Sequence, residues 1–173
     1  MINRPVIKTD RLALRVPEIG DSDAFAAFLK LDRSKFVGGP GFDFMASCRA
    51  WGHAAASWMF HGYGPFTICL PDGTTIGHAG PWFPRPWPEP EFGWCLWAEE
   101  YDGQGYASEA MTAIRDWTFA NTDLTSLVAY IDPANDASKR LAERLGGVVD
   151  PNAKAPDDDP VVIYRISAGA HHE

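Results

Sequence analysis

Two closely spaced glycines, Gly103 and Gly105, lie between a predicted strand and a predicted helix. Glycine allows positive φ angles and lets the backbone approach a ligand closely. A helix that begins near Ala107 would add unpaired N–H groups and the positive end of its dipole at the same point. Backbone amides gathered in this way are suited to a pyrophosphate, although glycines between a loop and a helix also form simple turns.

Two other phosphate loops fit this segment poorly. A P-loop requires Lys followed by Ser or Thr after its last glycine, and Tyr106 and Ala107 do not supply them. A dinucleotide fingerprint needs a third Gly or Ala where Ser108 stands, and it normally opens a doubly wound domain. Here a long segment with an antiparallel hairpin comes first. The sequence therefore excludes the first pattern and disfavours the second.

The elements that would position this loop are predicted from the period of the apolar residues. Helical spacing predicts helices over residues 21–31 and 44–60, the second with a buried face that includes Met45, Trp51 and Met59. Residues 71–74 have the composition of a hairpin turn. The predicted strands span residues 12–16, 66–70, 75–83, 91–97, 125–131, 148–149 and 161–166.

A strand, helix and strand surround the glycines. Residues 91–97 and 125–131 should be parallel and joined right-handedly through a helix over residues 107–119. A further helix is expected after residues 132–136. The prolines of residues 84–90 exclude a helix or a central strand and predict a stiff loop. The fold class is therefore α/β with a mixed sheet.

Length and composition fit one compact domain over residues 1–173, because 46% of the residues are hydrophobic. The formal net charge of -8 argues against a nucleic-acid surface, and it suits an amine-bearing ligand or simply solubility. The three cysteines lack metal-site spacing, so no metal is expected. Neither a secretory signal nor an apolar run long enough to cross a membrane occurs, which predicts a soluble, cytoplasmic protein.

Four segments in a fixed order resemble the GNAT superfamily of N-acetyltransferases, in particular its branch similar to ribosomal-protein alanine N-acetyltransferases. They are residues 9–15, 91–94, 103–110 and 135–138, which read TDRLALR, EFGW, GQGYASEA and NDAS. The resemblance covers nearly the whole chain. It implies a mixed, mostly antiparallel sheet of about seven strands with helices on both faces and a splayed pair of parallel strands at the cofactor site.

The resemblance also implies acetyl-CoA as co-substrate, with its pantetheine arm along residues 91–97 and its pyrophosphate on the glycine loop. In the family the loop pattern begins with Gln or Arg, where this chain has Asp102. We expect Asp102 to point outward and to reduce affinity rather than change the ligand. The implied cofactor contacts are Leu96, Trp97, Gly103, Gln104, Gly105, Tyr106, Ala107, Ser108, Asn135 and Ser138.

The implied reaction is direct attack of an amine on the thioester, so a base must first take a proton from the ammonium. Glu91 is the first candidate, because several family members place an acidic base there, and a rim charge is the alternative. His78 is the second candidate, although a lone His on a strand is commonly structural. This chain lacks the Tyr that often protonates the leaving thiolate. Ser138 is the candidate acid or a residue that satisfies local backbone, and Glu109 is expected to make a structural hydrogen bond.

Two functional hypotheses follow. The first is an N-acetyltransferase that acts on a peptide N-terminus or a small amine, and the second is a non-catalytic acyl-CoA-binding or partner-binding module. Whether the transferred acyl group is acetyl or longer stays open. The predicted helix over residues 44–60 and the proline-rich loop over residues 84–90, with Trp82 and Trp87, should wall the acceptor side or form a homodimer surface.

Overall fold

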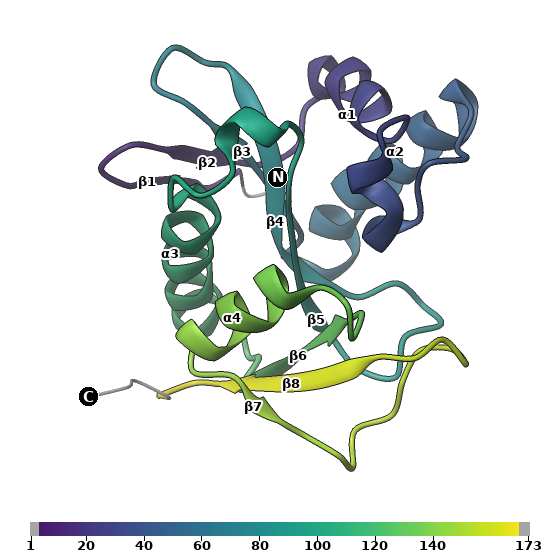
Figure 1. Ribbon diagram of the computed structural model, residues 1–173. Coiled ribbons are helices and arrows are strands. Elements are labelled where there is room, and N and C mark those ends of the chain that lie inside the picture. Colours follow the sequence, from purple (N-terminus) through teal and green to yellow (C-terminus); the bar gives the residue numbers. More distant parts are fainter. Residues whose placement is uncertain (1–3, 170–173) are drawn as a thin grey trace.

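The computed structural model describes residues 4–169, which form one eight-stranded sheet with helices on both faces (Figure 1). The strand order is β1-β2-β3-β4-β5-β6-β8-β7. Paired strands are antiparallel except β5 and β6, which are parallel. The strands are β1 (Val6–Lys8), β2 (Ala13–Arg15), β3 (Phe66–Cys69), β4 (Thr75–Trp82), β5 (Glu91–Leu96), β6 (Ser126–Ile131), β7 (Val148–Val149) and β8 (Val162–Ser167).

The sheet has one strand more than the sequence predicts. The additional strand is β1, which pairs with β2 through a register that includes Ile7↔Leu14. In β1 a partly buried Ile7 lies between exposed Val6 and Lys8, and three residues are too few for a recognisable alternation. The predicted mixed sheet and its parallel strand pair are confirmed.

Four α-helices and three short 3-10 helices connect the strands of the described residues. They are η1 (Ile19–Asp21), α1 (Ser22–Phe28), η2 (Asp32–Val37), α2 (Phe44–His61), η3 (Glu99–Tyr101), α3 (Tyr106–Asn121) and α4 (Asp136–Arg144). The predicted helix over residues 21–31 is too long, because Leu31 has an extended backbone and caps η2. Asp43 begins α2 by accepting the Ala46 amide, and Gly62, with φ of 75°, ends it.

The buried face of α2 differs from the predicted one. Trp51 is 2% exposed, whereas Met45 and Met59 are 59% and 60% exposed. The small residues Ser47 and Ser57 lie on the buried face instead. Their hydroxyls donate to carbonyl oxygens one turn earlier in the helix, so they are buried without loss of hydrogen bonds. Hydrophobic periodicity does not identify such positions, because serine is polar.

The two faces of the sheet carry different cores. Phe92 and Leu96 of β5 pack with Met111 and Ile114 of α3 in the larger core. Trp97, just beyond β5, belongs to a second core of largely aromatic side chains from α1 and α2. Figure 1 shows α3 and α4 on one side of β4 and β5, and α1 and α2 on the other. Side-chain alternation along β5 therefore divides the molecule into two halves.

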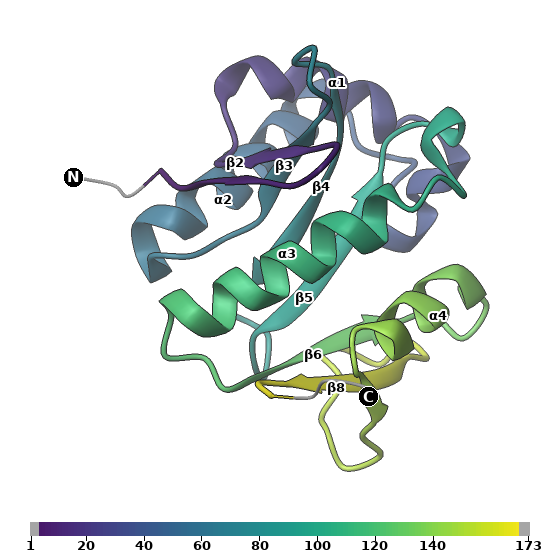
Figure 2. The ribbon, with the colours of Figure 1, turned by 90° about the vertical axis from the view of Figure 1, so that its left-hand side faces the viewer.

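β5 and β6 touch at one end and then part. Their one register pair is Glu91↔Val128, and the Val128 amide donates to the Pro90 oxygen at 3.1 Å. Beyond this point β5 is held by β4 and β6 by β8. Figure 2 shows the two strands diverging, with the N-terminal ends of α3 and α4 at the open end. The splayed parallel pair implied by the resemblance is therefore present.

A buried ion pair joins the first strands to the helices on the α1 face. Asp21 is 3% exposed and accepts Nη1 and Nη2 of Arg15 at 2.8 and 2.6 Å. The Thr67 hydroxyl and the Glu18 amide donate to the same carboxylate. Burial by itself acts to raise the pKa of Asp21, but these donors outweigh it and lower the pKa overall.

Asp21→Ala should lower the free energy of unfolding at pH 7 by about 3 kcal/mol, because it removes the buried carboxylate that bonds to two nitrogens of Arg15 and leaves only the exposed Glu18 carboxylate at 3.8 Å. The folded-state pKa of Asp21 is depressed. Its contribution is therefore present above the unfolded pKa of about 4 and is lost as the pH falls through the folded value. Urea unfolding at pH 7 and at pH 3 measures the effect, with the exposed Asp23→Ala as control. An equal loss at both pH values would contradict the ionic origin.

Candidate active site

The glycine loop presents unpaired amides at the start of α3. Gly103 and Gly105 have φ of 71° and 81°, and Gly105 is the N-cap of the helix. α3 begins at Tyr106, and no side chain of the cap bonds to its first turn. Residues 102–105 are exposed. The first-turn amides and the helix dipole therefore act together on any anion that reaches the loop.

Arg11 fixes this loop to the N-terminal segment of the chain. Its Nη1 donates to the Gln104 oxygen at 2.9 Å and its Nε to Glu109 Oε2 at 2.7 Å, while its guanidinium lies 4.6 Å from the centre of the Tyr106 ring. Glu109 also accepts the Thr9 hydroxyl. Burial acts to raise the pKa of Glu109, but the hydrogen bonds from Thr9 and Arg11 lower it overall. Glu109 thus makes the structural hydrogen bonds expected of it.

The β5 residues whose backbone groups face the open side differ from those that the resemblance implies. The Trp97 amide donates to the Ile76 oxygen at 2.8 Å, and Trp97 is 5% exposed. Its amide is therefore not available to a pantetheine arm, which corrects the expectation for Trp97. Leu96 lies opposite Gly77 at the next, non-hydrogen-bonded position of the β4–β5 ladder, so its backbone groups and those of Trp94 face the open side.

The start of α4 places two of the expected residues beside this edge. Asn135 is the N-cap, and its Oδ1 accepts the Ser138 amide at 3.1 Å. Ser138 Oγ accepts the Trp94 Nε1–H at 3.1 Å. Because a hydroxyl both accepts and donates, the Ser138 O–H is left to donate elsewhere. Ser138 therefore adjoins β5, whereas the side-chain oxygen of Asn135 is used in capping.

Glu91 lacks a cationic partner, unlike the other carboxyl groups of residues 4–169 that are not exposed. Five described carboxyl groups are not exposed, and four of them form ion pairs with arginines: Asp21, Glu89, Glu109 and Asp150. Within residues 4–169, Glu91 forms no ion pair. Burial raises the pKa of Glu91 from 4.5 to about 7. A carboxyl group with this pKa is poised to exchange a proton near neutral pH.

Two polar groups near Glu91 have no hydrogen-bond partner among the described residues, Trp87 Nε1 and the Tyr130 hydroxyl. The Trp87 indole approaches the Glu91 carboxyl and offsets part of its pKa rise, although Nε1 lies outside hydrogen-bond geometry. Burial, followed by the negative charges of Glu89 and Glu91, raises the pKa of Tyr130 to about 12. No local sequence pattern points to Tyr130, because its proximity to Glu91 follows from the register of β6 beside β5.

His78 belongs to the aromatic core. Its Nδ1 accepts the Trp97 Nε1–H at 3.0 Å, which places the ring proton on Nε2. Burial lowers the pKa of His78 to about 4, so the imidazole is neutral at pH 7. Phe25 and Trp51 pack edge-on against the ring at 5.5 and 5.9 Å between centres. These contacts support the structural interpretation of His78 rather than a role as base.

Asp102 is paired with an arginine from a distant segment. Arg33 of η2 donates from Nη2 to Asp102 Oδ1 at 2.8 Å and from Nε to the Leu96 oxygen at 3.2 Å. The Asp102 side chain is 55% exposed, in agreement with its expected outward orientation. Sequence reasoning missed Arg33, because no local pattern relates η2 to a residue 69 positions later.

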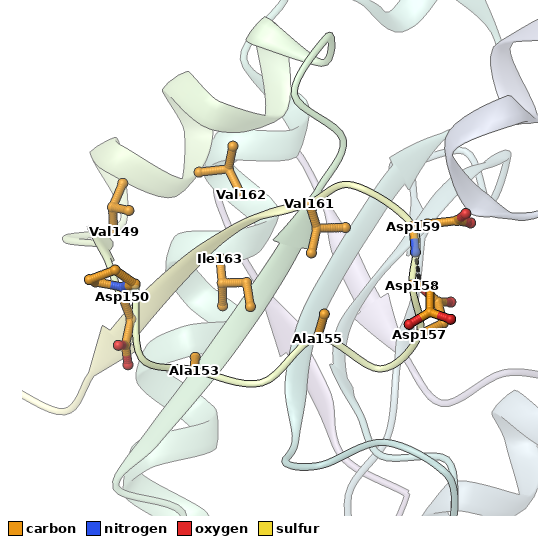
Figure 3. Close-up of a pocket in the computed structure, with 11 residues that line it drawn as sticks. Val149, Asp150, Ala153, Ala155, Asp157, Asp158, Asp159, Val161, Val162 and Ile163 are labelled. Atoms are coloured by element: carbon orange, nitrogen blue, oxygen red, sulfur yellow. Dashed lines mark hydrogen bonds between the residues drawn. The ribbon is translucent and has the colours of Figure 1, made fainter.

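A cavity of about 470 Å³ lies under the loop between β7 and β8 (Figure 3). Acidic side chains at Asp150, Asp157, Asp158 and Asp159 line it together with apolar residues such as Ile163. Asp150 is neutralised by Arg165, and the Asp159 amide bonds to Asp157 within the loop. The cavity shares no lining residue with the glycine loop, the β5 edge or Glu91.

The described residues hold few of the features of other kinds of site. No group of three or more His, Cys, Asp or Glu side chains that could hold a metal ion occurs in residues 4–169. Within the same residues, none of the helices has the length and apolar character needed to span a membrane. Cys48, Cys69 and Cys95 are free thiols.

Glu91→Gln should raise the free energy of unfolding at pH 8 by up to about 3 kcal/mol. The folded-state pKa is raised, so the folded protein binds this proton more tightly, and wild-type stability falls as the pH rises from 4.5 to about 7. The variant should therefore gain little at pH 4 and most above pH 7. Urea unfolding across this range measures the gain, with the exposed Glu99→Gln as control. A difference independent of pH would show that Glu91 titrates normally.

Comparisons with known proteins agree with this arrangement. The family model described as the acetyltransferase (GNAT) domain matches residues 11–148. The crystal structure of an acetyltransferase from Agrobacterium tumefaciens str. C58 is 37% identical, covers 100% of this chain and 97% of that chain, and superposes with a TM-score of 0.88. The uncharacterised protein YkkB of Bacillus subtilis (strain 168) is 41% identical over 51 residues, which span 30% of each chain.

Two further solved structures are similar at the level of fold. The aminoglycoside acetyltransferase AAC(6')-Ib in complex with coenzyme A is 17% identical, with 92% of this chain and 96% of that chain covered and a TM-score of 0.77. The ribosomal alpha-N-protein acetyltransferase RimL is 16% identical, with 95% and 94% covered and a TM-score of 0.74. Because the family model spans most of the sequence, from residue 11 to residue 148, the chain belongs to the GNAT acetyltransferase family.

Proposed function

We propose that residues 1–173 form one acyl-CoA-dependent N-acyltransferase domain that transfers the acetyl group of acetyl-CoA to a primary amine. The observation that carries the proposal is Glu91, a partly buried carboxyl group that forms no ion pair within residues 4–169 and lies where β5 and β6 part. Membership of the family supports acetyl transfer. The raised pKa of Glu91 supports an amine acceptor, because an ammonium must lose a proton before it can attack.

The residues around the parting strands fit acetyl-CoA as co-substrate. The uncapped amides of α3 suit a pyrophosphate, and the free backbone edge of β5 suits the amide groups of a pantetheine arm. A fold neighbour solved with coenzyme A supports this assignment. The proposed contacts are Leu96, Gly103, Gln104, Gly105, Tyr106, Ala107, Ser108, Asn135 and Ser138, with Trp94 in place of Trp97. The proposed reaction uses no metal ion.

In the proposed reaction Glu91 takes a proton from the ammonium, and the neutral amine attacks the thioester carbonyl. An amide of the free β5 edge, at Trp94 or Leu96, stabilises the oxyanion of the tetrahedral intermediate. The intermediate collapses by breaking the C–S bond and releases the CoA thiolate. The free O–H of Ser138 is the proposed proton donor to that thiolate, and the Ser138 oxygen takes in exchange the second proton that the attacking nitrogen must lose, so that the products are the neutral amide and the CoA thiol. His78 takes no part, because burial lowers the pKa of its imidazole to about 4, which makes it a weak base, and its Nδ1 already accepts the Trp97 Nε1–H.

The proposed acceptor is a small-molecule amine or a peptide N-terminus. Trp82 packs against His53 at 4.7 Å between ring centres, and Trp87 adjoins Glu91, so aromatic faces are available for a cation or an apolar amine. The fold neighbours include one acetyltransferase for aminoglycosides and one for a ribosomal protein, which supports both kinds of acceptor. The net charge of -8 suits a cationic acceptor.

The proposal includes a cytoplasmic location and self-association. The free thiols of the three cysteines suit a reducing compartment. A homodimer is supported by apolar side chains on the surface of α2, where Phe44 and Phe60 are 56% and 68% exposed.

Wild-type protein should melt at a higher temperature with acetyl-CoA or CoA, and not with NAD or ATP. A ligand at about 100 times its Kd adds roughly 2.7 kcal/mol to stability. Thiol release should then require both acetyl-CoA and an amine, tested with small amines and with peptides that have free N-termini. Binding without amine-dependent release would favour the alternative, a non-catalytic acyl-CoA-binding module. No shift with either CoA species would overturn the cofactor assignment.

Glu91→Gln should lower amine-dependent kcat/KM by about a hundredfold or more and leave the Kd for acetyl-CoA nearly unchanged. Wild-type kcat/KM should rise with pH and pass an inflection near the pKa of Glu91, about 7. That inflection should be absent from the variant. Glu89→Gln is the matched control, because Glu89 is a neighbouring carboxylate neutralised by Arg165. Equal turnover by wild type and Glu91→Gln from pH 6 to pH 9 would remove Glu91 from the mechanism.

A further inference from the structure

The glycine loop carries no cationic residue of its own. Residues 102–108 contain Asp102 and neither Lys nor Arg, so the intrinsic attraction of the loop for a phosphate comes from amides and the α3 dipole. A carboxylate beside a pyrophosphate opposes binding. The charge of Asp102 is compensated, however, because the Arg33 guanidinium pairs with it at 2.8 Å. Two arginines from other parts of the chain therefore reach this loop. Arg11 is committed to Glu109 through two nitrogens and to the Gln104 oxygen through the third, which leaves Arg33 as the cation with donors to spare.

Arg33 connects the two parts of the proposed cofactor site. Its Nε bonds to the Leu96 oxygen on the free edge of β5, and its Nη2 bonds to Asp102, the residue before Gly103. The Arg33 side chain is 18% exposed, so the guanidinium is held between strand and loop rather than extended into solvent. These bonds use two of the five guanidinium N–H donors, and the others have no partner among the described residues.

We propose that Arg33 supplies the cationic contact to the pyrophosphate of CoA that the glycine loop lacks, and that Asp102 is its anchor. This inference rests on the proposed use of acetyl-CoA. A planar guanidinium presents paired N–H groups that match the oxygens of a phosphate. Asp102 occupies one side of this fork and orients the remainder. Asp102, at the start of the loop, thus positions Arg33 to contact the pyrophosphate.

The alternative is that Arg33 is a structural tether between η2 and the loop. Arg115 makes a tether of the same kind in α3, remote from the start of that helix. Its Nη2 pairs with Asp116 at 2.7 Å, its Nη1 donates to the Leu145 oxygen at 3.2 Å, and the two charged side chains are 12% and 57% exposed. Arg115→Met is therefore a control matched in residue type, ion pair and burial.

Calorimetric titration with CoA, dephospho-CoA and pantetheine separates the phosphate groups, because dephospho-CoA keeps the pyrophosphate and lacks the 3′-phosphate. Arg33→Met should weaken binding of CoA and dephospho-CoA by about ten- to a hundredfold and leave pantetheine binding unchanged. Arg33→Lys, which keeps the charge without the fork, should lose less. The Arg33→Met loss should shrink as salt concentration rises. Arg115→Met should bind all three ligands as the wild type does.

Asp102→Asn distinguishes an anchor from a repelling charge. It should weaken CoA binding, although it removes a negative charge from the loop, and tighter binding would overturn the anchoring role. The Arg33 contact is overturned by unchanged CoA affinity in Arg33→Met, by an equal loss for pantetheine, or by a loss confined to CoA with dephospho-CoA unaffected. A wild type that does not bind CoA would overturn the proposed function and this inference together. If the wild type binds CoA and one of the contrary results for Arg33→Met or Asp102→Asn is found, this inference alone is overturned.

Discussion

The parting of β5 from β6 is the constraint on which the candidate site depends. After Glu91 and Val128 the two strands share no register pair, so β5 loses one of its neighbours while β4 still holds its other edge. Backbone N–H and C=O groups on the free edge then need other partners, because unpaired buried polar groups are costly. Arg33 supplies one of these partners, to the Leu96 oxygen. The same divergence brings the start of α4 to β5 through the bond between Ser138 and Trp94.

Arginine pairing decides which carboxyl group is chemically active. Glu89, two residues before Glu91, is bonded by two nitrogens of Arg165, and Arg165 also bonds to Asp150. In such a pair the guanidinium compensates the charge of the carboxylate. Glu91 has no such partner within the described residues, and burial therefore dominates its pKa. Two carboxyl groups that are two residues apart thus differ in whether a cation compensates their charge.

The parts of the structure that sequence could predict are those with local signals. The glycine loop, the helix after it and the parallel strands on either side depend on residue types and periods within short windows, and the structure confirms these elements. The errors arose where tertiary contacts decide. The backbone groups of successive strand residues point to opposite neighbours, and a prediction of strand boundaries does not specify which residue points to which side. For this reason the prediction included Trp97, whose amide is bonded to β4. Arg33 and Tyr130 could not be found, because their surroundings come from distant segments.

The glycine loop also has a place in the order of folding. The arginine that holds its backbone is Arg11, and the carboxylate that holds Arg11 is Glu109, 98 residues later. Closing so long a span is entropically unfavourable until other contacts support it. During synthesis Arg11 leaves the ribosome long before its partner does. The bonds that hold the loop can therefore form only after the intervening residues, which include β2 to β5, have been made.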